Sequence, residues 1–188
     1  MAVDDDSQEV VRQLAVGKLA ESMLALRGRD ALSLHGLADR TSIERKVLRG
    51  LEAGALNPSL KTLDRVAAAF GVSVAQLFGG RTEASGCILG SPALIAINVK
   101  RLRHSRHWST ADLESRIRMK AAYVSFIETG RAGCTLQTLA RLAAGFDVDI
   151  AELLSPPVRL APQDSRTRRV SSIPRKSRID PPANPTRE

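Results

Sequence analysis

The sequence repeats itself at an offset of 76 residues, and this repeat limits the folds open to the chain. Residues 19–78 align with residues 95–154 without a gap. Identities between the copies fall at Leu26, Arg27, Ser33, Leu37, Glu52, Gly54, Leu60, Thr62, Leu63, Arg65, Ala67, Phe70, Val72, Ala75 and Leu77. A period of this kind marks one structural unit used twice. We therefore predict two copies of one small domain.

The apolar residues of each copy recur at the spacing of a helix face. In the first copy this holds for Ile43, Val47, Leu48 and Leu51, which are expected on the third helix. Ser33 and Ser109 stand where a serine caps a helix start, and Asp112 adds a capping box in the second copy only. No alternating strand pattern competes. The predicted fold is all-α, with five short helices in each copy.

The segments outside the repeat divide the rest of the chain. We expect an N-terminal extension at 1–16, domains at 17–78 and 93–155, a linker at 79–92 and a tail at 156–188. The extension is expected to lengthen the first helix rather than to form a separate arm. Ser91 followed by Pro92 predicts a helix start for the second domain, with Ser91 as its cap.

Most of the net charge of +8 lies in the tail. Residues 156–188 carry eight basic and three acidic side chains, whereas residues 1–78 carry ten of each. The tail is rich in Pro, Ser and Arg and lacks apolar periodicity, which predicts disorder. A basic tail beside folded domains favours a polyanionic partner, and a solubilising role is the alternative.

Several functional classes find no support in the sequence. No apolar run reaches membrane-spanning length and the start lacks the features of a signal peptide, so we expect a cytoplasmic protein without a membrane partner. Cys87 and Cys134 match neither a disulfide framework nor a zinc site, and we expect Cys134 to be a small buried thiol rather than a redox switch. His35, His104 and His107 suggest no catalytic set. We expect no cofactor, no metal and no enzymatic activity.

The first copy resembles the lambda-repressor-like, or Xre/Cro, helix-turn-helix family in the stretch LADRTSIERKVLRGLEAGALNPSLKTLDRVAAAFGVSVAQLF. The second copy is similar but looser in the stretch LESRIRMKAAYVSFIETGRAGCTLQTLARLAAGFDVDIAELL. The resemblance covers most of the chain. It implies sequence-specific binding of double-stranded DNA and usually transcriptional control, most often repression, in a bacterium or a mobile element.

The resemblance also implies a role for two glutamates in otherwise apolar stripes. In matching family members an arginine late in the first helix pairs with a glutamate at the end of the third. Arg27 with Glu52, and Arg103 with Glu128, occupy those places. A charge within an apolar stripe needs a partner, and a guanidinium fits a carboxylate in a bidentate manner. We predict two structural ion pairs.

The family places its third helix in the major groove, with N-terminal residues at the base edges. In the first domain the predicted base-reading residues are Arg45, Lys46 and Arg49, with Glu44 as a further candidate. Arginine and lysine donate to guanine, and glutamate accepts from cytosine. The alternative for these charges is a solvated helix face.

The second domain differs at the matching positions, which hold Lys120, Ala121, Ala122 and Ser125. Because alanine only touches thymine methyl groups, two interpretations stay open. Either this domain reads a T-rich half-site, which is the interpretation we favour, or Tyr123 and Phe126 contact a protein partner. The second interpretation corresponds to an adaptor, an antitoxin or a coactivator.

Phosphate contacts are expected after the third helix and at the start of the fourth, where backbone N–H groups point outward. The candidates there are Asn57, Ser59, Lys61, Arg131, Thr135 and Gln137, and Arg118, before the third helix, is a further candidate. The chain departs from the family at the turn, where Ser42 and Arg118 replace the usual glycine. Glu44 and Lys120 replace the usual Ser or Thr helix cap.

The linker length bears on how the domains share a DNA site. A flexible linker of 14 residues averages roughly 20 Å end to end and reaches about 46 Å when extended. Successive major grooves on one face lie about 34 Å apart. One chain can therefore act as a built-in pseudo-dimer. A homodimer of the two-domain chain on a longer palindrome is the alternative.

Overall fold

The structure, a computed structural model, describes residues 5–80 and 90–157 of the 188-residue chain. Most of the predicted linker and nearly all of the predicted tail at 156–188 lie outside the described residues. Every regular element in the described part is a helix, so the all-α prediction is confirmed. None of these helices is both long and apolar enough to cross a membrane.

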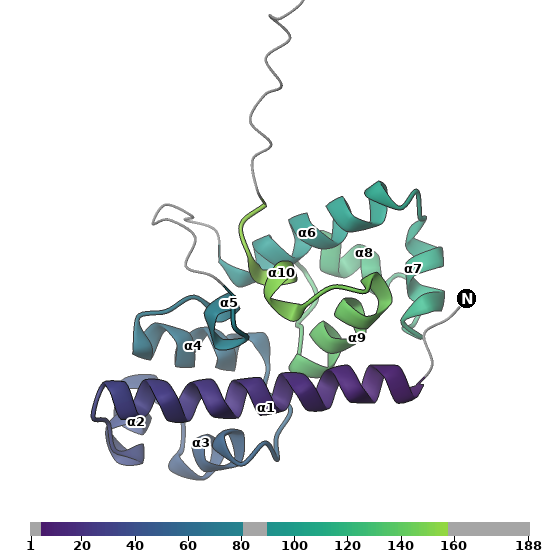
Figure 1. The fold of residues 1–188 in the computed structure, drawn as a ribbon. Coiled ribbons are helices and arrows are strands. Elements are labelled where there is room, and N and C mark those ends of the chain that lie inside the picture. Colours follow the sequence, from purple (N-terminus) through teal and green to yellow (C-terminus); the bar gives the residue numbers. More distant parts are fainter. Residues whose placement is uncertain (1–4, 81–89, 158–188) are drawn as a thin grey trace, which may run out of the picture. The chain divides into compact units, whose positions relative to one another are not determined.

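The helices follow the repeat (Figure 1). The first domain contains α1 (Asp5–Arg29), α2 (Leu34–Thr41), α3 (Arg45–Glu52), α4 (Leu60–Phe70) and α5 (Val74–Leu77). The second domain contains α6 (Ser91–Ser105), α7 (Thr110–Arg116), α8 (Tyr123–Glu128), α9 (Leu136–Phe146) and α10 (Ile150–Leu154). The prediction of five helices in each copy is confirmed.

The predicted helix caps form in both domains. The Ser33 side chain accepts from the N–H group of Gly36 at the start of α2. At the start of α7, Ser109 and Asp112 form the predicted reciprocal capping box, whose hydrogen bonds lower the pKa of Asp112. The cap of α6 differs from the prediction. This helix begins at Ser91 as expected, but Gly90 occupies the cap position.

The fully buried side chains of the two domains occupy equivalent positions of the repeat. Side chains with no exposed surface include Met23, Leu37, Leu48 and Leu63 in the first domain, and Val99, Leu113, Val124 and Leu139 at the equivalent places in the second. Burial of such side chains stabilises each domain by roughly 1.5–3 kcal/mol per residue before entropic costs. Aliphatic side chains make up most of this core, and Phe70, Phe78 and Phe146 are buried with them.

The first helix is longer than its counterpart because residues 5–16 continue it. This matches the expectation of a lengthened helix rather than a separate arm. The added turns place Ala15 and Val16 against buried apolar residues, and α1 packs along α9 of the second domain (Figure 1). Helix α5 packs against its own equivalent, α10. The two domains therefore share apolar contacts.

Candidate nucleic-acid interface

Helix α3 buries one side and exposes the other. Leu48 and Leu51 are at most 2% exposed and anchor the inner side. The residues predicted to read bases, Glu44, Arg45, Lys46 and Arg49, are all exposed. Their side chains form no hydrogen bond or ion pair with any other residue that the structure describes. Their charges are therefore available to an external ligand.

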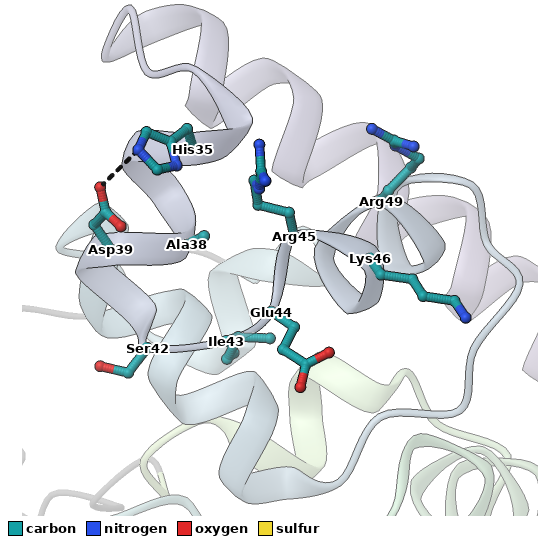
Figure 2. A pocket seen from close by; sticks show the side chains of 9 residues that line it. All are labelled: His35, Ala38, Asp39, Ser42, Ile43, Glu44, Arg45, Lys46 and Arg49. Atoms are coloured by element: carbon teal, nitrogen blue, oxygen red, sulfur yellow. Dashed lines mark ion pairs between the residues drawn. The ribbon is translucent and has the colours of Figure 1, made fainter.

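The cationic side chains of α3 border an open groove of about 720 Å³. Figure 2 shows Arg45 and Arg49 projecting to the same side from successive turns of the helix. The groove is lined by His35, Ala38, Asp39, Ser42, Ile43, Glu44, Arg45, Lys46 and Arg49. It thus lies along the junction of α2 and α3, where the two helices of a helix-turn-helix meet a DNA groove.

The turn between α2 and α3 is held in place by a side chain from α4. Ser42 takes the left-handed conformation, with φ 50° and ψ 37°, at the position where the family usually has glycine. Arg65 Nε donates to the carbonyl of Thr41 at 2.8 Å, and Arg65 Nη2 donates to the carbonyl of Ser42. Ile43 is buried but precedes the helix, so its predicted place on α3 is wrong. In the sequence Arg65 stands out only as an identity between the two copies, and its hydrogen bonds to the turn were not predicted.

The two predicted ion pairs are present and have the same pattern of hydrogen bonds. Arg27 Nε lies 2.8 Å from Glu52 Oε1, and its Nη1 donates to the carbonyl of Leu32 at 3.1 Å. Each pair links the first helix of its domain to the end of the third. Each pair therefore fixes the position of α3 or α8 relative to the first helix of its domain.

The pair in the second domain is the more buried of the two. Both of its side chains are close to one-tenth exposed, whereas the Arg27 side chain is 28% exposed. Arg103 Nη1 also donates to the carbonyl of Trp108 at 2.8 Å. The hydrogen bond with Glu128 raises the pKa of Arg103, so this guanidinium stays charged.

The recognition helix of the second domain is shorter than predicted. Helix α8 begins at Tyr123, so Lys120, Ala121 and Ala122 precede it, whereas α3 begins one position after Glu44. Ala122 has a left-handed backbone, with φ 67°, and serves as the cap position. The expectation that Lys120 replaces the usual helix cap is therefore wrong. Ser125 lies on the helix and is exposed.

Glu114 explains where α8 begins. This buried carboxylate, only 8% exposed, accepts from the N–H group of Val124 through Oε1 at 3.1 Å. It thereby satisfies a backbone donor of the first turn that has no partner within the helix. The first domain has Ala38 at the equivalent position. Glu114 is not among the residues predicted from the sequence, where its one available signal is a charge beside the apolar residues of α7.

The surface of the second domain mixes apolar and basic groups. Phe126 is 49% exposed on α8, and the Tyr123 hydroxyl donates to the carbonyl of Gly133 at 3.1 Å. Arg118 and Arg131 are exposed on the same domain. Arg116 stacks over the Trp108 ring at 4.2 Å, so this cation is directed toward protein.

Some predicted phosphate ligands are engaged between the domains instead. The N–H groups of Leu60 and Leu136 donate to Cys134 and Pro58, and that of Gln137 donates to Asn57 Oδ1 at 2.9 Å. The expectation that the backbone at these helix starts faces phosphate is therefore wrong for three N–H groups.

At the starts of α4 and α9, most of the candidate phosphate-binding side chains bond to other parts of the protein, whereas one is exposed. Ser59 and Thr135 cap α4 and α9. Asn57 and Gln137 bond each other across the domains, whereas Lys61 is exposed. Among the phosphate candidates of this loop and helix start, Lys61 therefore keeps its charge available to an external ligand.

No metal site is formed in the part of the chain that the structure describes. No group of three or more His, Cys, Asp or Glu side chains is arranged to hold an ion there. Cys134 is buried, and burial raises the pKa of its thiol to about 11. An uncharged thiol is a poor nucleophile, which agrees with a packing role.

Comparison with protein families agrees with the geometry of both domains. A family model described as "Helix-turn-helix" matches residues 25–77, and one described as "Helix-turn-helix domain" matches residues 95–155. No curated protein and no solved structure gave a significant match. The matched segments coincide with the two halves of the repeat and contain α3 and α8. The chain belongs to the lambda-repressor-like helix-turn-helix family and carries two such DNA-binding domains in tandem.

Proposed function

We propose that this protein represses transcription by binding a specific DNA sequence with α3 in the major groove. The observation that carries the proposal is the outward face of α3, where Arg45, Lys46 and Arg49 are exposed and unpaired among the described residues. A guanidinium in this position donates two hydrogen bonds to guanine O6 and N7. Repression requires only that the bound site overlap a promoter.

Each exposed group on the first domain has a chemical role in this proposal. Arg45, Lys46 and Arg49 read guanine, and Glu44 accepts from the amino group of cytosine. Lys61, exposed at the start of α4, binds phosphate and sets the register without reading sequence. The first domain thereby supplies most of the discrimination between sequences.

The second domain binds the adjacent DNA with less discrimination. Lys120 and Ser125 donate or accept at base edges, and Ala121 and Ala122 contact thymine methyl groups. Arg118 and Arg131 add phosphate contacts from the exposed surface of this domain. The proposed second half-site is therefore T-rich and weakly specified.

A protein-binding role for the second domain is the competing candidate. It is favoured by one observation, the exposed Phe126 on an α8 that begins two residues later than its counterpart. An exposed aromatic side chain is common at the core of protein interfaces. In that case the first domain binds DNA and the second recruits a protein, as in a coactivator or an antitoxin.

Selection of binding sites from random double-stranded DNA tests the proposal. The full chain is expected to enrich one motif that contains guanine on the face read by α3, with affinity falling steeply between 50 and 200 mM salt. Repression is then tested by placing the selected motif across a promoter that drives a reporter gene. Selection that enriches no motif at any salt concentration contradicts the proposal and favours the adaptor.

A further inference from the structure

The two domains meet through equivalent residues of the repeat. Ser59 and Thr135, which are 76 positions apart, face each other in an isolated antiparallel bridge. The N–H group of Leu60 donates to the carbonyl of Cys134 at 2.7 Å. The N–H group of Leu136 donates to the carbonyl of Pro58 at 2.9 Å. Each bond repeats the other with the domains exchanged, which is the relation that a two-fold axis produces.

The bridge is anchored in the core on both sides. Leu60 and Leu136 are the first residues of α4 and α9, and their side chains are 5% and 1% exposed. Pro58 contributes only a carbonyl, so its missing N–H group costs nothing here. Because these side chains are packed in the cores of their own domains, the bridge restricts the orientation of one domain relative to the other.

Asn57 adds a contact that the repeat does not duplicate. Its Oδ1 accepts from the N–H group of Gln137 at 2.9 Å, and its Nδ2 lies 3.5 Å from both Thr135 Oγ1 and Gln137 Oε1. The equivalent position in the second domain is Gly133, which has no side chain. We call residues 57–60 and 134–137 together the domain joint.

We propose that the domain joint sets the separation of two unlike DNA half-sites read by one chain, with Asn57 as a positioning residue. This inference rests on the proposed function. Only four residues separate the end of α3 from Asn57, so the joint lies close along the chain to the DNA-reading helix. In dimers of this class, half-site spacing mirrors the symmetry of the protein. Here both halves belong to one chain, and their unlike helices require an asymmetric site.

The pairing of other elements supports a fixed arrangement. Helix α5 packs on its equivalent α10, and Ser91 Oγ at the start of α6 donates to Asp64 Oδ1 at 2.6 Å. Several contacts between the two domains thus agree with one relative orientation. A chain held in this way differs from two domains on a flexible linker, which tolerate several spacings.

Altered spacing within the selected DNA site tests the inference. One, two or five base pairs are inserted between the two halves of the motif, and each base pair rotates the second half by roughly 35°. The wild-type chain is expected to bind the original spacing as one chain per site and to lose at least about tenfold in affinity with two or five added pairs. Fluorescence titration measures the affinity, and analytical ultracentrifugation of the complex measures the stoichiometry.

Variants of Asn57 separate positioning from phosphate binding. Asn57→Ala is expected to reduce the dependence on spacing without abolishing it, because the backbone bridge and the helix contacts remain. Asn57→Asp preserves the dependence because its carboxylate still accepts from the Gln137 N–H group. If Asn57 binds phosphate instead, the added negative charge of Asn57→Asp weakens every spacing alike. Lys61→Ala is the matched control, which should lower affinity equally at all spacings.

The outcomes distinguish this inference from the proposed function. A motif confined to a single half-site, an affinity insensitive to spacing, or two chains on each site overturns the inference while leaving DNA reading by α3 intact. A phosphate-like response of Asn57→Asp overturns the positioning role of Asn57. Failure to select any motif removes the proposed function itself.

Discussion

Arg103 and Glu128 form a bidentate ion pair, with Nε 2.6 Å from Oε1 and Nη2 3.0 Å from Oε2. The third nitrogen of the same guanidinium donates to a loop carbonyl, so one side chain ties together α6, the loop after it and the end of α8. Arg27 makes the same three connections in the first domain. The C-terminal end of the helix proposed to bind DNA is therefore held to the first helix by an ion pair.

Glu52→Ala is expected to destabilise the protein strongly. Removing the carboxylate leaves the mostly covered Arg27 guanidinium without its partner, and breaking one member of a buried pair costs about 3–5 kcal/mol. Glu44→Ala is the control on the same helix, where an exposed and unpaired carboxylate contributes within about 0.5 kcal/mol. Urea denaturation followed by circular dichroism measures both. Equal midpoints for the two variants would argue against a structural role for the pair.

Glu114→Ala is expected to weaken the start of α8. The Val124 N–H group then loses its buried acceptor, which costs about 1–3 kcal/mol in the free energy of unfolding. Glu114→Gln retains a side-chain oxygen and should recover most of that loss. Thermal unfolding of the two variants beside the wild type provides the measurement. A glutamine variant no more stable than the alanine variant would show that the acceptor oxygen is not what matters.

The raised pKa of Cys134 predicts a loss of stability at high pH. Burial lifts the thiol pKa from 9.0 to about 11, so the folded state keeps a proton that the unfolded state releases. This contribution is fully present below pH 9 and declines as the pH rises from about 9 toward 11. The stability advantage of wild type over Cys134→Ala should shrink across that range in urea titrations. A constant difference would mean that the thiol does not titrate in this way.

The same burial predicts low thiol reactivity in the folded protein. In a Cys87→Ser background, which removes the other cysteine, Cys134 should react slowly with a disulfide reagent at pH 8 and rapidly after unfolding in urea. The rate with saturating DNA should match the rate without it. Rapid labelling of the folded protein would contradict a buried thiol and favour a redox switch at Cys134.

Removing residues 159–188 is expected to weaken binding to all DNA sequences alike. The truncated segment carries eight basic and three acidic side chains, and phosphate neutralisation of this kind does not depend on sequence. The slope of log affinity against log salt should therefore become shallower, while the selected motif stays the same. Competition between specific and random DNA checks both. A changed motif would assign sequence reading to the tail.

The sequence was sufficient for the features that depend on periodicity and pairing. The repeat and its apolar spacing predicted both domains, and two charged positions in apolar stripes, Glu52 and Glu128, predicted the ion pairs. Local rules also predicted the caps at Ser33 and Ser109. These features follow from residues close in sequence or from a pattern that the family shares.

Features that depend on tertiary contacts, between the copies or within one, were not predictable in the same way. Asn57 and Gln137 match the expected phosphate positions, yet they bond each other because the domains bring their helix starts together. The late start of α8 depends on Glu114, ten residues away in sequence. A self-comparison shows that positions are equivalent. It does not show that Ser59 and Thr135 meet.

Sequence selection with Arg45→Ala and Arg49→Ala tests the central claim most directly. If α3 reads DNA in the major groove, each variant should still select the wild-type motif but lose the preference for guanine at one position, at a cost of about 1–3 kcal/mol there. Lys61→Ala should weaken binding without changing any position. Unchanged motifs from both arginine variants, with affinity lowered equally on all sequences, would contradict base reading by α3.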